Sequence, residues 1–460
     1  MKSSKQLSLS ERLWASESDW EARWEEFGED ETMQVDPELV AKVADEFSER
    51  MKSNYPFFHR RYAGQMLKPP HPIAAAVYQM TMKINPNNHA LDGGPVTGKM
   101  EVEAVADLAH MFGYRNHLGH LTSSGTIANL EALWIARSLR PKSAIAFSTS
   151  AHYTHRRMCE VIGVEGTEIP TDDFGRMDCG ALEKALKAGK VGMVVATVGT
   201  TSLGAIDPLE QIIPLCRQYN VRVHADAAYG GFFMLLAQQK HPIINPASYL
   251  HLSECDSIVV DPHKHGLQPY GCGCILFGDP SVGKFYKHNS PYTYFTSKDL
   301  HLGEISLECS RPGAAAAALW FTLKCIPLQP DKGLGAILTK TRRSALEFSK
   351  LIASSRVLRE FVKPELDIAT YFSNTEPLTD TLISQRSEKI FSDAMHRSTN
   401  PLFLALLQVD SKNVRGLHPN ISLDHEMMTI LRSALMKPEH LAFVPQLVRE
   451  LEILAGDETK

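Results

Sequence analysis

Alternation of short apolar segments with longer amphipathic ones, between residues 99 and 277, restricts the fold more than any other feature. The short segments are rich in β-branched residues and lack polar–apolar alternation, as is typical of strands buried on both faces. They predict strands at 144–147, 192–198, 221–225, 257–260 and 274–277. The longer segments predict helices at 99–111, 126–140, 182–188 and 208–219. This order predicts an α/β fold with a mostly parallel sheet covered by helices.

Changes in pattern along the chain divide it into three predicted parts. Residues 1–70 form a polar, helical N-terminal segment, and residues 71–325 form a large domain that contains the sheet. Residues 326–460 are predicted to form a smaller C-terminal α/β domain. Pro327 and Pro330 mark the hinge between the two domains, because neither residue fits well inside a helix or strand.

The N-terminal segment carries more aromatic residues than a solvated tail needs. Trp14, Trp20 and Trp24 fall within it, and Asp36 followed by Pro37 predicts the start of a helix. We expect this segment to pack against a partner subunit or, alternatively, against the rest of its own chain.

The composition argues against several classes of protein. With a formal net charge of −5 and no basic block, the chain is not expected to bind nucleic acid. Its first residues lack the apolar core of a signal peptide, and no segment reaches the roughly 20 apolar residues of a membrane span. The eight cysteines lie mostly in apolar segments and lack the spacing of a metal site. We therefore expect a cytoplasmic protein without membrane contact and without a bound metal.

Two charged residues follow predicted strands and indicate the chemistry. Asp226 ends the segment 221–225, and Lys264 stands shortly after the segment 257–260. Ligands bind at the carboxyl ends of the strands in parallel sheets, so both side chains should lie at one edge. Pyridoxal 5'-phosphate needs a lysine amine for its aldehyde and a carboxylate for its pyridine nitrogen. The pair predicts this cofactor, although either residue alone is also consistent with a surface lysine or a structural ion pair.

Small and hydroxyl-bearing residues come directly before the helix predicted at 126–140. Ser123, Ser124, Gly125 and Thr126 would let the backbone approach an anion where the free N–H groups of a helix point outward. The phosphate of the cofactor is the anion that we expect here. An ordinary serine-capped helix is the alternative.

Four further residues follow predicted strands or stand beside the lysine. His152 could stack on the cofactor ring or simply cap a helix, and Thr201 could bond a ring substituent or belong to a polar turn. Ala228 is small enough to leave room for a flat ring. His263 could orient the phosphate or relay a proton.

Together these motifs resemble those of the group II pyridoxal-phosphate-dependent amino acid decarboxylases, which have the aspartate aminotransferase fold (fold type I). The resemblance extends over about residues 55 to 325. It is carried by Gly64-Gln65-Met66, residues 122–129, Gly199-Thr200-Thr201, residues 224–229 and Asp261-Pro262-His263-Lys264.

The resemblance implies a role for each matching residue. Lys264 would form the aldimine with the cofactor, Asp226 would pair with the pyridinium nitrogen, and His152 would stack on the ring. The remaining cofactor contacts would come from Ser123, Ser124, Gly125, Thr126, Thr201, Ala228 and His263. The implied reaction is decarboxylation of an L-amino acid to an amine and carbon dioxide, through a quinonoid intermediate. A homodimer with shared active sites is the implied assembly.

The substrate side is implied by weaker similarity. Many members of the family protonate the quinonoid with a loop tyrosine, which corresponds here to Tyr294 or, in another register, to Tyr292. Tyr62 and Gln65 fall near the expected substrate pocket. Arg311 would bind an anionic group or, alternatively, form a buried ion pair.

Other functions stay open at this point. A carbon–carbon lyase, an aldolase or an aminotransferase on the same fold would use the same cofactor. A catalytically silent binding protein is the alternative from a different class, and the complete set of Lys264, Asp226 and His152 argues against it.

Overall fold

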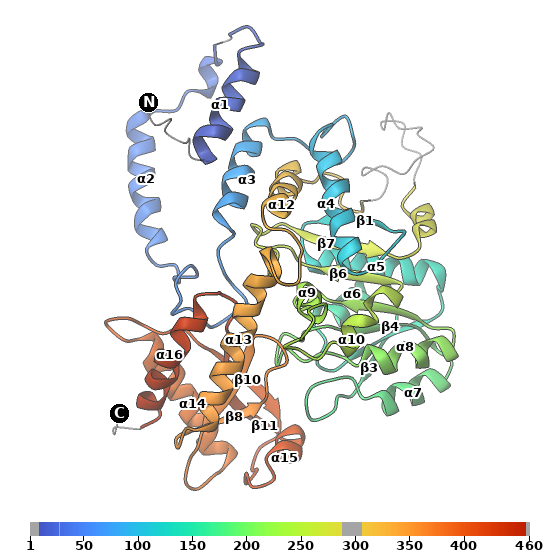
Figure 1. Ribbon diagram of the computed structural model, residues 1–460, viewed down its shortest axis with the longest axis vertical. Helices are drawn as coiled ribbons and strands as arrows, with labels where there is room; N and C mark the ends of the chain where they lie inside the picture. The colour runs from blue at the N-terminus through green and yellow to red at the C-terminus, as the bar shows by residue number, and fades with distance from the viewer. Residues whose placement is uncertain (1–8, 27, 288–305, 457–460) are drawn as a thin grey trace.

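The computed structural model describes residues 9–26, 28–287 and 306–456, and these form two sheets (Figure 1). The large sheet has seven strands in the order β1-β7-β6-β5-β4-β2-β3. Its strands are β1 (Leu118–Thr122), β2 (Ala144–Ser148), β3 (Gly166–Ile169), β4 (Val191–Thr197), β5 (Arg222–Asp226), β6 (Ser257–Val260) and β7 (Gly273–Phe277). Neighbouring strands run parallel except where β7 pairs with β1 and β6. The predicted α/β fold with a mostly parallel sheet is confirmed.

All five predicted strands are present, as β2, β4, β5, β6 and β7, with bounds that agree to within one residue. The sequence did not predict β1 and β3, which form the two edges of the large sheet. In β3 only Ile169 is buried, so this strand lacks the apolar signal of its central neighbours. Edge strands are covered on fewer sides, and their sequences are correspondingly more polar.

The central strands are largely buried because helices cover both faces of the large sheet. Every residue of β4 is buried. Val194 and Ala196 belong to the core on one face, whereas Met193 and Val195 belong to the core on the other. The surrounding helices are α3 (Pro72–Ile84), α4 (Thr97–Met111), α5 (Gly125–Leu139), α6 (Thr154–Ile162), α7 (Cys179–Lys187), α8 (Leu209–Gln218), α9 (Met234–Ala237), α10 (Ala247–Leu250) and α12 (Gly313–Cys325). The four predicted helices correspond to α4, α5, α7 and α8.

The small sheet lies in the C-terminal part of the chain and is antiparallel (Figure 1). Its order is β10-β11-β9-β8. The elements of this part are α13 (Gly333–Ala353), β8 (Leu358–Val362), β9 (Ile368–Ser373), α14 (Asp380–Met395), β10 (Ala405–Asp410), α15 (Ser411–Leu417), β11 (Met427–Ala434) and α16 (His440–Leu454). Helix α13 packs against α16, β8 and β9.

The N-terminal segment forms two helices with different surroundings. Helix α1 (Leu9–Glu21) contacts α3, and the Lys83 ammonium lies 3.3 Å from the ring centre of Trp14. Helix α2 (Pro37–Met51) starts as predicted, with the Asp36 carboxylate accepting the N–H of Glu38. No residue of α2 is buried, and Figure 1 shows this helix standing clear of the body of the molecule. In the described ranges, none of the helices has the length and apolar character needed to cross a bilayer.

Candidate active site

The carboxyl ends of five strands of the large sheet meet at one edge. Ser124 follows β1, His152 follows β2 and Thr201 follows β4. Asp226 ends β5, and Lys264 follows β6. These side chains enclose a cavity of about 190 Å³. It is lined by Ser124, Gly125, Thr126, Asn129, His152, Thr154, Thr197, Gly199, Thr201, Asp226, Ala228, Tyr229, Asp261, His263 and Lys264.

Nine of the ten residues predicted to contact the cofactor line this cavity, and the tenth is Ser123. Ser123 is exposed, and its backbone N–H donates to Glu308 at 2.8 Å. Ser124 is the residue that caps helix α5, because its hydroxyl accepts the N–H of Ile127. The structure therefore places Ser124 rather than Ser123 at the predicted phosphate end of the cavity.

Asp226 is a buried carboxylate that is held in its charged form. Its Oδ2 lies 2.8 Å from Nε2 of His155, and its Oδ1 accepts the N–H of Ala228 at 3.2 Å. Burial favours the protonated acid. The hydrogen bond from His155 and the charges of His155 and Lys264 outweigh burial and hold the pKa of Asp226 well below its usual range. A buried anion of this kind is suited to pairing with a protonated ring nitrogen.

Lys264 lines the same cavity, with about a quarter of its side chain exposed. Its ammonium lies 3.1 Å from Oδ2 of Asp261, whose Oδ1 is buried without a hydrogen-bond partner. A Cβ atom on Gly125 would lie 2.5 Å from the Asp261 carboxylate, so this position accepts only glycine. The absent side chain lets the first turn of α5 approach the lysine.

Two histidines border the cavity in neutral form. Burial lowers the pKa of His152, whose Nδ1 is 2.7 Å from the Thr154 hydroxyl. Burial also lowers the pKa of His263. Nδ1 of His263 donates to the Cys272 carbonyl at 2.8 Å. A neutral imidazole offers a flat, uncharged face, which suits a stacking role against an aromatic ring.

These features fit the cofactor that the sequence predicts. The cavity combines a buried anion, a reachable amine and the N-terminus of a 15-residue helix that begins with glycine. Each corresponds to one functional group of pyridoxal phosphate, namely the pyridine nitrogen, the aldehyde and the phosphate.

A second cavity of about 570 Å³ adjoins the first, and His152 and Thr201 line both. Arg432 on β11 borders it and is almost fully buried. The Arg432 Nε donates to the Ser202 carbonyl and Nη1 lies 3.4 Å from Oε1 of Gln65, whereas Nη2 is buried without a partner. A buried, unsatisfied guanidinium donor favours an anionic ligand in this second cavity.

The predicted substrate residues are not brought together. Gln65 lines the second cavity, but Tyr62 lines neither. Arg311 is buried with Glu101 and also donates to the carbonyls of Asn88 and Leu121. This placement is the buried ion pair that the sequence left open as the alternative. Tyr294 and Tyr292 lie outside the described residues.

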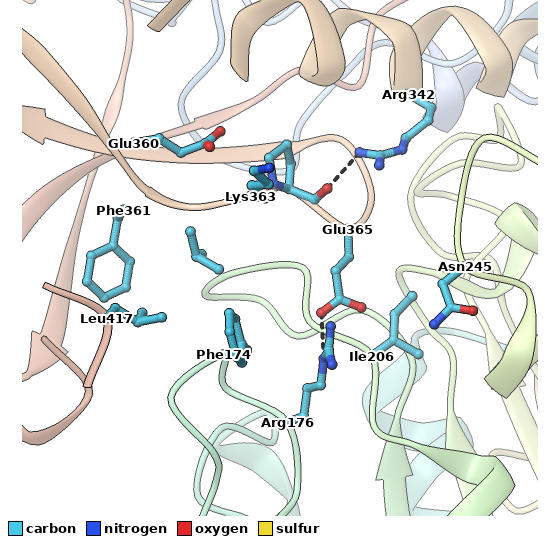
Figure 2. Close-up of a pocket in the computed structure, with 12 residues that line it drawn as sticks. Phe174, Arg176, Ile206, Asn245, Arg342, Glu360, Phe361, Lys363, Glu365 and Leu417 are labelled. Atoms are coloured by element: carbon cyan, nitrogen blue, oxygen red, sulfur yellow. Dashed lines mark hydrogen bonds and ion pairs between the residues drawn. The ribbon is translucent and has the colours of Figure 1, made fainter. Parts of the chain in front are cut away.

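A third cleft, of about 430 Å³, opens between loops of the large sheet and the turn that joins β8 to β9 (Figure 2). Arg176 and Glu365 both line this cleft and form an ion pair, with 2.8 Å between Nε of Arg176 and Oε1 of Glu365. None of the predicted site residues is among those that line this cleft. It is therefore separate from the cofactor cavity.

Neither His155 nor Arg432 was assigned to the site from the sequence. The sequence offered a signal for His155, because this residue stands in the same short segment as His152 and in the first turn of α6. Arg432 had no local signal, because it lies in a C-terminal strand remote from every motif.

Comparisons with known proteins agree with this geometry. A family profile described as "Pyridoxal-dependent decarboxylase conserved domain" matches residues 28–366. The chain is 32% identical to the "Probable L-tyrosine/L-aspartate decarboxylase" of Methanothermobacter thermautotrophicus, over 57% of this chain and 70% of that protein. It is 26% identical to the "L-tyrosine decarboxylase" of Enterococcus faecium, over 76% of this chain and 75% of that protein.

Solved structures show the same fold. Mouse CSAD superimposes with a TM-score of 0.78 at 20% identity, covering 98% of this chain and 93% of CSAD. Oryza sativa TDC, solved with PLP and tryptamine, gives a TM-score of 0.77 at 17% identity, with coverage of 98% and 99%. Since the family profile spans most of the chain and the cavity suits its cofactor, this protein belongs to the pyridoxal-dependent decarboxylase family and is an amino acid decarboxylase that uses pyridoxal phosphate.

Proposed function

We propose that this protein releases carbon dioxide from the α-carbon of an L-amino acid, with Lys264 and Asp226 as its central residues. The observation that carries the proposal is that both side chains line one cavity, with Asp226 kept anionic by His155 and Lys264. When bound, pyridoxal phosphate supplies an electron sink for the bond that breaks at the α-carbon.

Each residue then has a definite task. Asp226 stabilises positive charge on the ring nitrogen, and His155 fixes the orientation of that carboxylate. Lys264 holds the cofactor and afterwards carries a proton on its amine, which Asp261 keeps within 3.1 Å. His152 and Ala228 line the cavity and would flank the cofactor ring, where the imidazole could stack on it and shield it from water.

The second cavity is the proposed place of the substrate side chain. Arg432 offers a buried cation with a free Nη2, which would bind a carboxylate of the substrate. Gln65 beside it supplies an amide. Relatives are named for tyrosine, aspartate and glutamate, and these three amino acids are the first candidates.

A visible absorption spectrum of the purified protein, followed by trapping of carbon dioxide with a panel of L-amino acids, tests the proposal. We expect a cofactor band that changes with one of the candidates, together with stoichiometric release of carbon dioxide and amine. A keto acid as the sole product would instead indicate an aminotransferase. Cleavage without release of carbon dioxide would indicate a lyase.

We also infer a homodimer, for which α2 is the support. Leu39, Val40, Val43, Phe47 and Met51 fall on one side of this helix and are all at least half exposed. Monomeric soluble proteins rarely leave such an apolar stripe in water, so a second copy of the chain is the proposed cover.

Analytical ultracentrifugation of two matched variants tests this assembly. Phe47→Lys places a charge within the apolar stripe and should yield monomer. Asp45→Lys places the same side chain on the opposite side of α2 and should remain dimeric. Dimer in both variants would exclude α2 from the interface.

A further inference from the structure

A buried contact joins the small sheet to the cofactor cavity at Asp367. This residue is fully buried and directly precedes β9. Its Oδ1 accepts the hydroxyl of Tyr229 at 2.6 Å, and its Oδ2 lies 3.4 Å from Nε2 of His265. Tyr229 lines the cofactor cavity three residues after Asp226, and His265 directly follows Lys264. One carboxylate of the small sheet thus contacts both segments that carry the proposed central residues.

The backbone around Asp367 is held in place by the β8–β9 turn. Arg342 on α13 donates to the carbonyls of Pro364 and Leu366, both at 2.8 Å. Figure 2 shows the Arg342 guanidinium reaching this turn and the Arg176–Glu365 ion pair beside it. These hydrogen bonds hold the turn in place, and they therefore also hold the backbone of Asp367 in place.

The cluster at Asp367 is tightly packed and incompletely satisfied. The ring centres of Tyr229 and His265 are 4.8 Å apart, and Phe233 lies 5.0 Å from His265. Both ring nitrogens of His265 and Oδ2 of Asp367 are buried without a hydrogen-bond partner. Such unsatisfied groups lower stability, so their presence beside a reactive site indicates a task other than folding.

The Tyr229 segment has little freedom on its other side. The N–H of Gly230 donates to the carbonyl of Val198 at 2.9 Å, and a Cβ at Gly230 would lie 2.3 Å from that same oxygen. The segment is therefore clamped between the end of β4 and Asp367. A shift at Asp367 has to be transmitted to Tyr229 and Ala228, which line the cavity.

We propose that Asp367 is a positioning residue for the cofactor site. Acting through Tyr229 and His265, it holds the segments of Asp226 and Lys264 at the separation that the cofactor requires. This inference rests on the cofactor roles proposed above for Asp226 and Lys264.

Four variants of the full-length protein separate this role from general support. Asp367→Ala removes both contacts together with the interactions of Asp367 with Thr341 and Lys68, whereas Tyr229→Phe removes one hydroxyl and keeps the aromatic ring. Asp367→Asn keeps an acceptor for Tyr229 and adds an N–H toward His265. Glu365→Gln is the matched control, because it weakens the nearby pair with Arg176 but touches neither Tyr229 nor His265.

The first measurement is the affinity of the cofactor-free protein for pyridoxal phosphate, followed by absorbance. We expect Kd to rise about 10-fold or more in Asp367→Ala and about 5-fold in Tyr229→Phe, by loss of a hydrogen bond to a charged group. Asp367→Asn should restore Kd to within about 3-fold of the parent, and Glu365→Gln should leave it unchanged.

The second measurement is amide hydrogen exchange of the cofactor-free protein. Exchange should accelerate in residues 226–231 and 261–268 of Asp367→Ala and Tyr229→Phe, and not in Glu365→Gln. This readout needs no turnover, so it separates the positioning role from the proposed decarboxylation. If the parent protein fails to bind the cofactor, the proposed function fails first.

Three outcomes would overturn the positioning role. One is an unchanged Kd for pyridoxal phosphate in Tyr229→Phe. This variant also tests the positioning role if Asp367→Ala does not fold. Another is faster exchange throughout the chain in every variant, which would indicate general support. The third is a Kd in Asp367→Asn as high as in Asp367→Ala.

Discussion

Asp226 and Asp367 are both buried aspartates beside the cofactor cavity, but one belongs to the large sheet and the other to the small sheet. The pKa of Asp226 is held well below its usual range, because His155 and Lys264 outweigh the effect of burial. The pKa of Asp367 is raised, because burial outweighs its hydrogen bond from Tyr229 and the charge of Lys68. The comparison teaches that neighbouring charges, rather than burial alone, decide in which direction the pKa of a buried acid shifts.

The two sheets contribute to the site in different ways. The large sheet presents its residues in motifs at strand ends, where one short segment supplies several contacts. The part of the chain that forms the small sheet contributes single residues. Arg432 lies within β11, and Asp367 directly precedes β9. If this division is correct, variants in the large sheet should affect the chemistry and variants in the small sheet should affect binding.

The largest effect is expected from Lys264→Ala. Without its amine we expect release of carbon dioxide to fall by about 10³-fold or more, because a covalent anchor and a proton carrier are lost together. A radiometric assay of carbon dioxide measures this, with the exposed Lys340→Ala as control. Activity within about 10-fold of the parent would remove Lys264 from the centre of the site.

Asp226→Asn should have the second largest effect, a fall in kcat of about 10²-fold, because the amide cannot stabilise a positive ring nitrogen. The low pKa of Asp226 also predicts how kcat depends on pH. The carboxylate stays ionised as pH falls, so kcat of the parent should show no loss between pH 8 and about pH 5 from this group. An acid limb that disappears in Asp226→Asn would contradict that assignment.

Arg432→Gln tests the contribution of the small sheet. We expect KM for the amino acid to rise by about 10- to 50-fold, the loss of one charge-assisted hydrogen bond, with a smaller change in kcat. Steady-state kinetics separates the two parameters, and Arg415→Gln on the exposed side of α15 is the control. An equal fall in kcat and kcat/KM would instead give Arg432 a role in the chemical step.

The last effect concerns stability, with one buried histidine near each sheet. Burial lowers the pKa of His224, on β5, and of His440, at the start of α16, to about 3 in each case. The unfolded chain therefore binds more protons between about pH 3 and pH 6.5, and stability falls as pH decreases through that window.

Urea unfolding of the cofactor-free protein across this pH range measures the effect. Each histidine should contribute a slope of up to about 1.4 kcal/mol per pH unit. His440→Gln should remove the contribution of His440 to the slope of the unfolding free energy against pH. The contribution of His224 should remain. An unchanged slope would mean that His440 binds its proton in the folded state.

The sequence predicted the large sheet well because its information is local. A run such as residues 192–198 is apolar throughout, and that pattern is legible without knowing which helices cover it. The edge strands β1 and β3 were missed because polar residues at an edge carry no such pattern. The nine predicted residues that line the cavity were identified for the same reason, since each lies in a short motif at or beyond the end of a strand.

Residues whose role depends on distant contacts were not predicted. His155 has the neighbours of any helix start, and only the fold places its Nε2 2.8 Å from Asp226. For Arg311 the sequence left both an anionic ligand and a buried ion pair open, and only the fold shows Glu101 beside it.

The sequence by itself determined the α/β class, the order of the central strands and helices, and the pair of residues that the cofactor requires. These follow from side-chain periodicity and from short motifs, which act over a few residues. Only the tertiary structure decided in which direction the pKa of each buried acid shifts and which residues of the small sheet reach the cavity. Asp226 and Asp367 illustrate the reason, because their hydrogen-bond partners, His155 and Tyr229, come from distant parts of the chain.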